Sequence, residues 1–360
     1  MEALLEALAK FAFFMLLFIL NIAALLTWVE RKQSAVMQDR IGANRATIFG
    51  IRAIGLFHPF ADVLKLFTKE FFIPMGARKL VFLMAPAISM FFGLIGFAAI
   101  PFGDTLIIGD RHIPLQIAPI NVGVLYVFAV LGLAVYGVVL GAWASNNNYA
   151  LLGGLRASAQ MLSYEVAIGI SLIGVIMIFG TVDLMEIARA QGELAWGWLP
   201  KWGIWLQPLG FLIFMAAGIA ETKRIPFDAP EGESEIVGYF IEYSSMGFGM
   251  YFLTDFLETI LIACLTATFF LGGWQVPYLY ADGFHFPWGA TVLLPNIVVV
   301  ILQFLSFALK VIILLFLMMA IRWTLPRFRY DQMMHLGWKI LLPASLVNIL
   351  ITAIIVVYLQ

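Results

Sequence analysis

The chain has 360 residues, of which 62% are hydrophobic and only 12% are charged, and its mean hydropathy is +0.97. An ordinary soluble domain carries about a quarter charged residues, so this composition predicts a polytopic membrane protein. The sequence has no basic surface of the kind that binds nucleic acid. One cysteine, Cys264, and four scattered histidines provide neither an internal disulfide nor a Cys/His metal framework.

Eight apolar runs are long enough to cross a membrane, since a span needs roughly 20 apolar residues. In chain order they are 11–29, 80–101, 117–143, 157–182, 202–220, 248–271, 290–321 and 340–359. We therefore expect an all-α polytopic membrane protein in which residues 1–360 form a single integral membrane domain. The first run should stay as a span, because the acidic start at Glu2 and Glu6 shows no cleavable signal pattern.

The distribution of basic residues predicts the orientation of these spans. With the N-terminus outside, the inner loops 30–79, 144–156, 221–247 and 322–339 hold 16 lysines and arginines, whereas the outer side holds four. Inner loops of membrane proteins carry such an excess. Both termini are therefore expected on the outer side, because the number of spans is even.

The first inner loop predicts an amphipathic helix at the membrane interface. Apolar residues recur there at helical spacing, namely Ala53, Leu56, Phe57, Phe60, Val63, Leu64 and Phe67. His58, Asp62, Lys65 and Lys69 fall on the other face, and Pro59 implies a start or a kink. Such a helix either seals the bundle or lines a ligand portal, and the pattern does not decide between these roles.

Two outer segments are expected to anchor the protein without chemistry. The segment 183–201 between the fourth and fifth spans predicts a short external amphipathic helix, with Trp196, Trp198 and Trp202 as an interfacial belt. The segment 272–289 is rich in Trp, Tyr, Pro and Gly and predicts a loop with aromatic anchors.

The most unusual stretch is 221–243, ETKRIPFDAPEGESEIVGYFIEY, between two apolar runs. It holds six acidic residues: Glu221, Asp228, Glu231, Glu233, Glu235 and Glu242. A helix is plausible after Pro230, with Glu231, Glu235 and Glu242 on one face. A solvated acidic loop is the common interpretation of such a run, but its length and its position between spans favour a functional role.

Three further carboxylates lie inside predicted spans, where an ionisable group indicates function unless a cation pairs with it. Glu165 is in the fourth span, and Asp255 and Glu258 share a face of the sixth, with Lys310 of the seventh as a candidate partner. A chain of carboxylates could lead from a cytoplasmic chamber into the membrane through Glu165, Glu221, Glu231, Glu235, Glu242 and Glu258. Burial would raise their pKa values toward neutrality. No nucleophile triad, phosphate loop or haem ligand pair is evident, so electrons would have to come from another subunit.

At this point a resemblance to a known family supplies a function. PFDAPEGESEIVGYFIEYS (226–244) and GLFHPFADVLKLFTKE (55–70) resemble two signatures of the H-subunit family of the proton-pumping NADH:quinone oxidoreductase, respiratory complex I. Five further blocks fit the family in the same order: WVERK (28–32), QDRIGANR (38–45), RASAQMLSYE (156–165), LPRFRYDQMM (325–334) and GWKILLP (337–343). The resemblance extends from Trp28 to the last span.

The resemblance implies a quinone chamber at the junction with a hydrophilic arm, in a bacterial inner membrane with both termini periplasmic. It places at the chamber and its entrance Glu30, Arg31, Arg40, Arg45, Asp62, Lys65, Arg224, Phe227, Asp228, Glu231, Glu233 and Glu235. Glu165, Glu221 and Glu242 would continue a proton path, to which burial logic adds Asp255 and Glu258. Quinone is then the substrate, and iron–sulfur clusters and flavin are expected only in partner subunits. The partners implied are the hydrophilic subunits, small membrane subunits and antiporter-like subunits.

Two alternatives remain at this stage. A homologous membrane subunit of an energy-converting hydrogenase would keep the fold and lack quinone. A stand-alone cation or proton transporter would need a midplane site on broken helices in paired halves, and no such pairing is evident.

Overall fold

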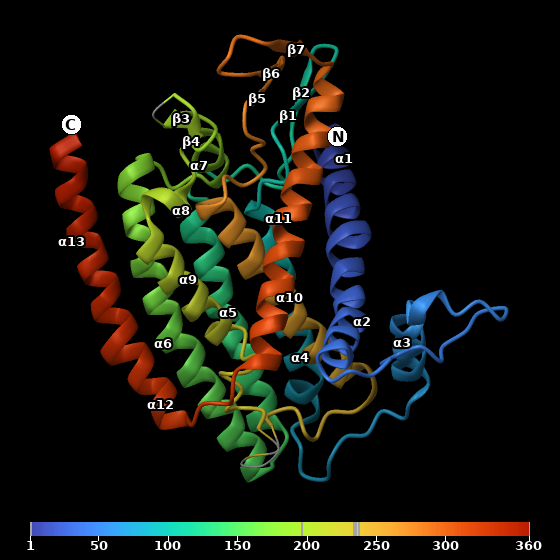
Figure 1. The fold of residues 1–360 in the computed structure, drawn as a ribbon. Helices are drawn as coiled ribbons and strands as arrows, with labels where there is room; N and C mark the ends of the chain where they lie inside the picture. The colour runs from blue at the N-terminus through green and yellow to red at the C-terminus, as the bar shows by residue number, and fades with distance from the viewer. Residues whose placement is uncertain (1, 196, 233–235, 237, 360) are drawn as a thin grey trace.

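The computed structural model describes the chain apart from residues 1, 196, 233–235, 237 and 360, and shows a bundle of long helices with small sheets at one end (Figure 1). Seven helices of the described chain are long and apolar enough to cross a membrane, which confirms the all-α polytopic prediction. They comprise α1 (Glu2–Phe11) running through η1 (Ala12–Ile19) into α2 (Leu20–Met37), then α4 (Lys79–Ile95) with η3 (Gly96–Ala99), α5 (Gly123–Ala144), α6 (Asn148–Phe179), α10 (Ser245–Phe270), α11 (Asn296–Thr324), and α12 (Tyr330–His335) running through η4 (Leu336–Leu341) into α13 (Leu342–Leu359).

The fifth predicted span is shorter than the sequence suggested. The run 202–220 is divided into α8 (Gly203–Leu206) and α9 (Pro208–Glu221), because Gln207 before the proline has the non-helical angles φ −136° and ψ 58°. At about 1.5 Å per residue, the 14 residues of α9 extend for roughly 21 Å. The two ends of the chain lie at the same end of the bundle (Figure 1), so the chain crosses an even number of times, and α9 supplies the crossing beyond the seven long helices.

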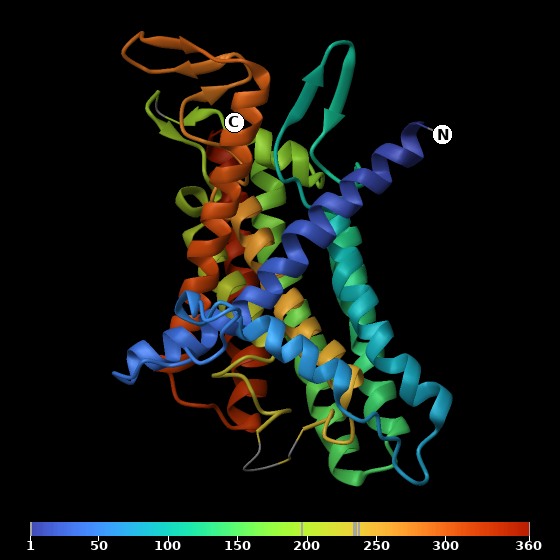
Figure 2. The same ribbon diagram turned by 90° about the vertical axis from the view of Figure 1, so that its right-hand side faces the viewer.

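Helix α10 forms the centre of the bundle. In its most apolar window 89% of the residues are buried, compared with 22% in the last helix. It packs against α2, α4, α9 and α11. Any charged residue in the middle of α10 is therefore enclosed by neighbouring helices. Figure 2 shows that the first helix runs obliquely across the bundle in front of this core.

The predicted amphipathic helix of the first loop is α3 (His58–Thr68), preceded by η2 (Ala53–Gly55). It begins later than the apolar periodicity because Pro59 suits only the first turn of a helix. Phe60, Leu64 and Phe67 are exposed, while other side chains face α2 and α10. The helix lies away from the chain termini, toward the end that also carries α12 (Figure 1).

The end that carries the termini holds three small antiparallel sheets, which we call the hairpin end. These are β1 (Thr105–Ile108) with β2 (Arg111–Pro114), β3 (Leu194–Ala195) with β4 (Leu199–Pro200), and β5 (Leu279–Tyr280), β6 (Gly283–His285) and β7 (Thr291–Leu293) in that order. The predicted outer helix is α7 (Leu184–Ala190), capped by Asp183, whose side chain accepts a hydrogen bond from the Met185 backbone. Four of its seven residues are buried, so α7 packs into the bundle. Trp198 is exposed, and Trp196 lies outside the described residues.

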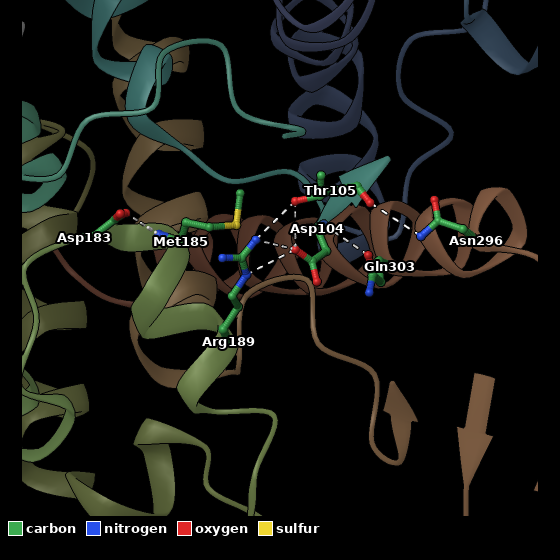
Figure 3. A network of polar contacts seen from close by, with 7 residues as sticks. All are labelled: Asp104, Thr105, Asp183, Met185, Arg189, Asn296 and Gln303. Carbon is green, nitrogen blue, oxygen red and sulfur yellow. Dashed lines mark hydrogen bonds and ion pairs between the residues drawn. The ribbon is translucent and has the colours of Figure 1, made fainter. Parts of the chain in front are cut away.

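A network of polar contacts ties the hairpin end together (Figure 3). Arg189 of α7 donates to Asp104 Oδ1 at 2.7 and 3.2 Å and to the Thr105 hydroxyl at 3.2 Å. Gln303 of α11 accepts from the Asp104 backbone at 3.1 Å, and Asn296 accepts from Ile107 at 2.9 Å. The first hairpin is thereby fixed to two helices that are distant in sequence.

Candidate functional site

The acidic segment between α9 and α10 folds inward as an irregular loop. Its described residues form turns and bends, so the prediction of a helix after Pro230 is wrong over those residues, and Glu233 and Glu235 lie outside the described part. Gly238 has a φ of 124°, which a helix does not permit. A Cβ at Gly153 of α6 would lie 3.0 Å from the Tyr239 nitrogen, so glycine there lets the loop rest directly on the helix.

Phe227 anchors this loop in the core. Its ring lies 5.6 Å from that of Tyr164 and 5.4 Å from that of Phe328, measured between centroids. Its carbonyl accepts a 2.8 Å hydrogen bond from Gln160, which also binds the last turn of α9. Phe227 was predicted to form part of the chamber loop. It does lie in that loop, but its side chain is buried among the rings of Tyr164 and Phe328.

A lysine that the sequence analysis left unassigned lies at the centre of the site. The Lys223 Nζ is 3.0 Å from Asp255 Oδ1 and 3.4 Å from Glu258 Oε2, and the Lys223 side chain is only 1% exposed. The prediction that Lys310 pairs with Asp255 and Glu258 is wrong. The Lys310 ammonium instead donates to the carbonyls of Gly273 and Gln275, beyond the C-terminal end of α10. The signal that could have identified Lys223 is its position three residues after the apolar run 202–220.

Three further arginines form ion pairs with other carboxylates of the site. Arg224 and Arg322 both contact Glu30, at 3.1 and 3.0 Å, and Arg327 contacts Asp228 at 2.7 Å. The structure therefore brings together three of the predicted chamber residues. Arg322 and Arg327 were not predicted, although both lie in a basic inner loop.

Two carboxylates of the cluster have no cationic partner among the described residues. Neither side-chain oxygen of Glu221 accepts a hydrogen bond there, and the same holds for Glu231 Oε1. Burial, together with the charges of Asp255 and Asp228, raises the pKa of Glu231 well above its ordinary value. A carboxyl group in this condition binds its proton more tightly than an exposed glutamate does.

The pKa values of two other loop residues are also shifted. Burial raises the pKa of Asp228, and the neighbouring Arg327 and Arg322 offset this only in part. Burial alone would lower the pKa of Lys223, but the carboxylates of Asp255 and Glu258 outweigh it and raise that pKa well above its ordinary value. Lys223 therefore remains positively charged inside the protein.

The predicted proton-path residues Glu165, Glu221 and Glu242 have different surroundings. The Glu165 carboxylate of α6 faces Gly132 of α5, where a Cβ would come within 2.9 Å of its Oε1. Glu221 lies within electrostatic reach of both Glu165 and Glu258. Glu242 is separate, since it is partly exposed and accepts a 2.6 Å hydrogen bond from Asn147 at the start of α6.

An apolar cavity of about 120 Å³ lies between α2, α3 and α10. Its lining includes Ala24, Pro59, Val63, Leu66, Phe252 and Leu253. Asp62 also lines it and pairs with Arg31 at 2.6 Å, with both side chains about two-fifths exposed. Among the other residues predicted here, Arg45 and Lys65 are exposed, and Arg40 is held by Gln38 and Ser34.

The chemistry available to this arrangement is proton transfer and the binding of an apolar molecule. In the described part of the chain no group of three or more His, Cys, Asp or Glu side chains is arranged to hold a metal ion. The structure thus holds buried carboxylates with and without an ion-pair partner, and a separately lined apolar cavity to which α10 contributes Phe252 and Leu253.

Comparison with known proteins places the chain among membrane subunits of one enzyme. Residues 9–353 match the family model described as NADH dehydrogenase. The chain is 46% identical over 334 residues to the first of the NADH-quinone oxidoreductase H subunits of Cytophaga hutchinsonii, covering 92% of each chain. It is 45% identical to the H subunit of the same enzyme from Thermomicrobium roseum, covering 95% of this chain and 94% of that one. Identity to the second of the H subunits of Geobacter sulfurreducens is 45%, with 94% and 93% covered.

Proposed function

This chain belongs to the NADH dehydrogenase family, as an H subunit of the membrane-bound NADH-quinone oxidoreductase, complex I, and on that premise we propose that it admits quinone from the membrane and couples quinone reduction to proton translocation. The enzyme is a translocating oxidoreductase. The quinone enters between α2, α3 and α10, and the coupling uses the buried carboxylates around Lys223.

The entrance is supported by the cavity between these three helices. Its lining is almost entirely apolar, which suits the isoprenoid tail of ubiquinone or menaquinone. The Arg31–Asp62 pair lies beside it and is half open to water, so a polar head group finds a polar contact at the same place. Of the two roles left open for α3, this combination supports that of a ligand portal.

The proton path is supported by the unequal pairing of the carboxylates. Glu30, Asp228, Asp255 and Glu258 each contact a cation, whereas Glu221 and Glu231 contact none among the described residues. A proton donor near pH 7 needs a carboxyl group whose pKa is raised, and Glu231 meets that condition. Glu165, within reach of Glu221, continues the path toward the opposite side of the bundle.

The rest of the complex supplies what this chain lacks. Hydrophilic partner subunits on the α3 side bind the quinone head group and hold the flavin and the iron–sulfur clusters. Small membrane subunits and antiporter-like subunits lie laterally and receive the coupling signal. The protein lies in the bacterial inner membrane with both termini periplasmic, as the excess of basic residues at the α3 end indicates.

The test compares two neighbouring substitutions on α2 in the complex purified through a tag on this chain. Ala24 lines the cavity, whereas Leu25 is 40% exposed and faces away from the core. Ala24→Phe should lower kcat/KM for quinone several-fold and leave NADH oxidation with a soluble acceptor unchanged. Leu25→Phe should leave both activities unchanged.

Two results would contradict the proposed quinone entrance between α2, α3 and α10. Full quinone reductase activity in the Ala24→Phe complex would move the entrance elsewhere, and equal losses in both variants would indicate general damage to α2. A purified complex that evolves hydrogen and does not reduce quinone would replace the quinone function with that of the hydrogenase relatives.

A further inference from the structure

Among the described ion pairs that involve a lysine, those of Lys223 are the most deeply buried. Both it and Glu258 have side chains 1% exposed, and that of Asp255 is 9% exposed. Its ammonium also lies 5.6 Å from the centroid of the Tyr239 ring. A charge placed this deep is costly unless its partners compensate it, so the arrangement depends on both carboxylates.

The backbone at Lys223 is held in an unfavourable conformation. Its φ is 54°, in the left-handed region, which glycine and asparagine adopt far more readily than lysine does. The residue occupies a turn directly after α9, so either of those residues would fit there with less strain. The presence of lysine is therefore explained by its side chain, because the backbone favours other residues.

The side chain separates the buried carboxylates into two classes. The groups that act electrostatically on Lys223, or on which it acts, are Asp255, Glu258, Tyr239, Glu231 and Glu221. Arg224 and Asp228 act on the same carboxylates from the loop. Among the described residues, Asp255 and Glu258 are the carboxylates that form ion pairs with the ammonium within 4 Å. The other two carboxylates face the cluster without a contact of this kind.

We infer that Lys223 is a positioning residue of the proton path: its ammonium binds Asp255 and Glu258 as one compensated unit, so that protons entering the cluster are carried by Glu231 and Glu221. This inference rests on the proposed proton path and assigns a function to a residue outside it. Lys223 itself neither gives nor takes the proton. It fixes which carboxylates are available.

The test is Lys223→Asn, which suits the left-handed backbone and removes the charge. Without the ammonium, the buried carboxylates of Asp255 and Glu258 lie close together with no positive charge between them. Their repulsion is relieved if one of them binds a proton, so that carboxylate stays protonated to a higher pH than it does in the parent complex. The pH profile of quinone-driven proton translocation in proteoliposomes should move upward by about one unit or more. NADH oxidation with a soluble acceptor should not change.

A second substitution identifies the cause. Lys223→Asn combined with Glu258→Gln leaves one carboxylate in place of two, so the profile should return toward that of the parent complex, with Glu258→Gln alone as the matched control. The inference is overturned if Lys223→Asn leaves the profile unchanged, or if the double variant is shifted as far as the single one. If Lys223→Asn prevents assembly, the double variant must restore it, and failure of both also overturns the inference.

Glu231→Gln in the same preparation separates this inference from the proposed function. Normal translocation in that variant removes the acidic loop from the proton path, whatever Lys223 does. Impaired translocation there, together with a parent-like pH profile in Lys223→Asn, removes only the role of Lys223.

Discussion

The Arg189–Asp104 pair at the hairpin end and the Lys223–Asp255 pair inside the bundle have similar nitrogen-to-oxygen distances, 2.7 and 3.0 Å, in opposite surroundings. The first pair has side chains 48% and 27% exposed, and the second 1% and 9%. Water can replace either partner of the exposed pair, and cannot do so for the buried one. The free energy at stake therefore depends on burial much more than on distance.

The two networks also differ in how completely they are satisfied. At the hairpin end, Arg189 binds two side chains, and Asn296 and Gln303 bind the backbone of the hairpin (Figure 3). Near Lys223, both carboxylate oxygens of Glu221 and the Oε1 of Glu231 are buried without a hydrogen-bond donor among the described residues. A satisfied network fixes a structure, whereas a network with unpaired carboxylates retains the capacity to bind protons.

The largest effect should follow when the buried pair is broken from the carboxylate side. Asp255→Asn with Glu258→Gln leaves the Lys223 ammonium buried without a counter-charge, which should destabilise the protein by about 3–5 kcal/mol. The thermal midpoint and the yield of the assembled complex measure this loss. Adding Lys223→Asn removes the unpaired charge and should recover most of the stability. Equal midpoints in the double and triple variants would contradict this account of the cluster.

A smaller but selective effect is expected within the acidic loop. Because burial and the charges of Asp255 and Asp228 raise the pKa of Glu231, this residue keeps its proton to a higher pH than an ordinary glutamate and loses it as the pH rises through that raised pKa. Glu231→Gln cannot release a proton, so quinone-driven translocation should fall on the order of tenfold or more. Glu242→Gln is the matched control, because Glu242 is partly exposed and bound to Asn147. Equal losses in both variants would assign the effect to the fold of the loop.

The sequence predicted the helices well because their signal is local. Hydropathy over about 20 residues identifies a span, and the proline in the first turn of α3 marked where that helix begins. The division of the fifth span at Gln207–Pro208 was also visible in the sequence, since a residue before proline avoids the helical conformation. The prediction of one continuous run over 202–220 gave apolar composition more weight than the proline.

The pairing of charges could not be predicted because it depends on residues that are far apart in the chain. Glu30 meets Arg224 across 194 positions, and no periodicity relates them. Lys310 was chosen for Asp255 and Glu258 because it lies inside a span, but it lies toward the other end of α10. The segment after Pro230 was predicted as a helix from its capping residues, but Gly238 has a non-helical φ of 124° and the backbone at Tyr239 packs against Gly153 of α6.

The smallest effect on stability, and the sharpest contrast in function, should come from two exposed pairs. Arg31–Asp62 and Arg189–Asp104 have arginine side chains 43% and 48% exposed, so Arg31→Gln and Arg189→Gln should each cost at most about 1 kcal/mol of stability. Arg31 lies beside the proposed quinone entrance, and its loss should raise the KM for quinone several-fold. Arg189 lies at the hairpin end, so its loss should leave quinone kinetics unchanged. If Arg189→Gln raised the KM as much as Arg31→Gln, the effect would not depend on the entrance, and the charged rim of the cavity would lose its proposed role.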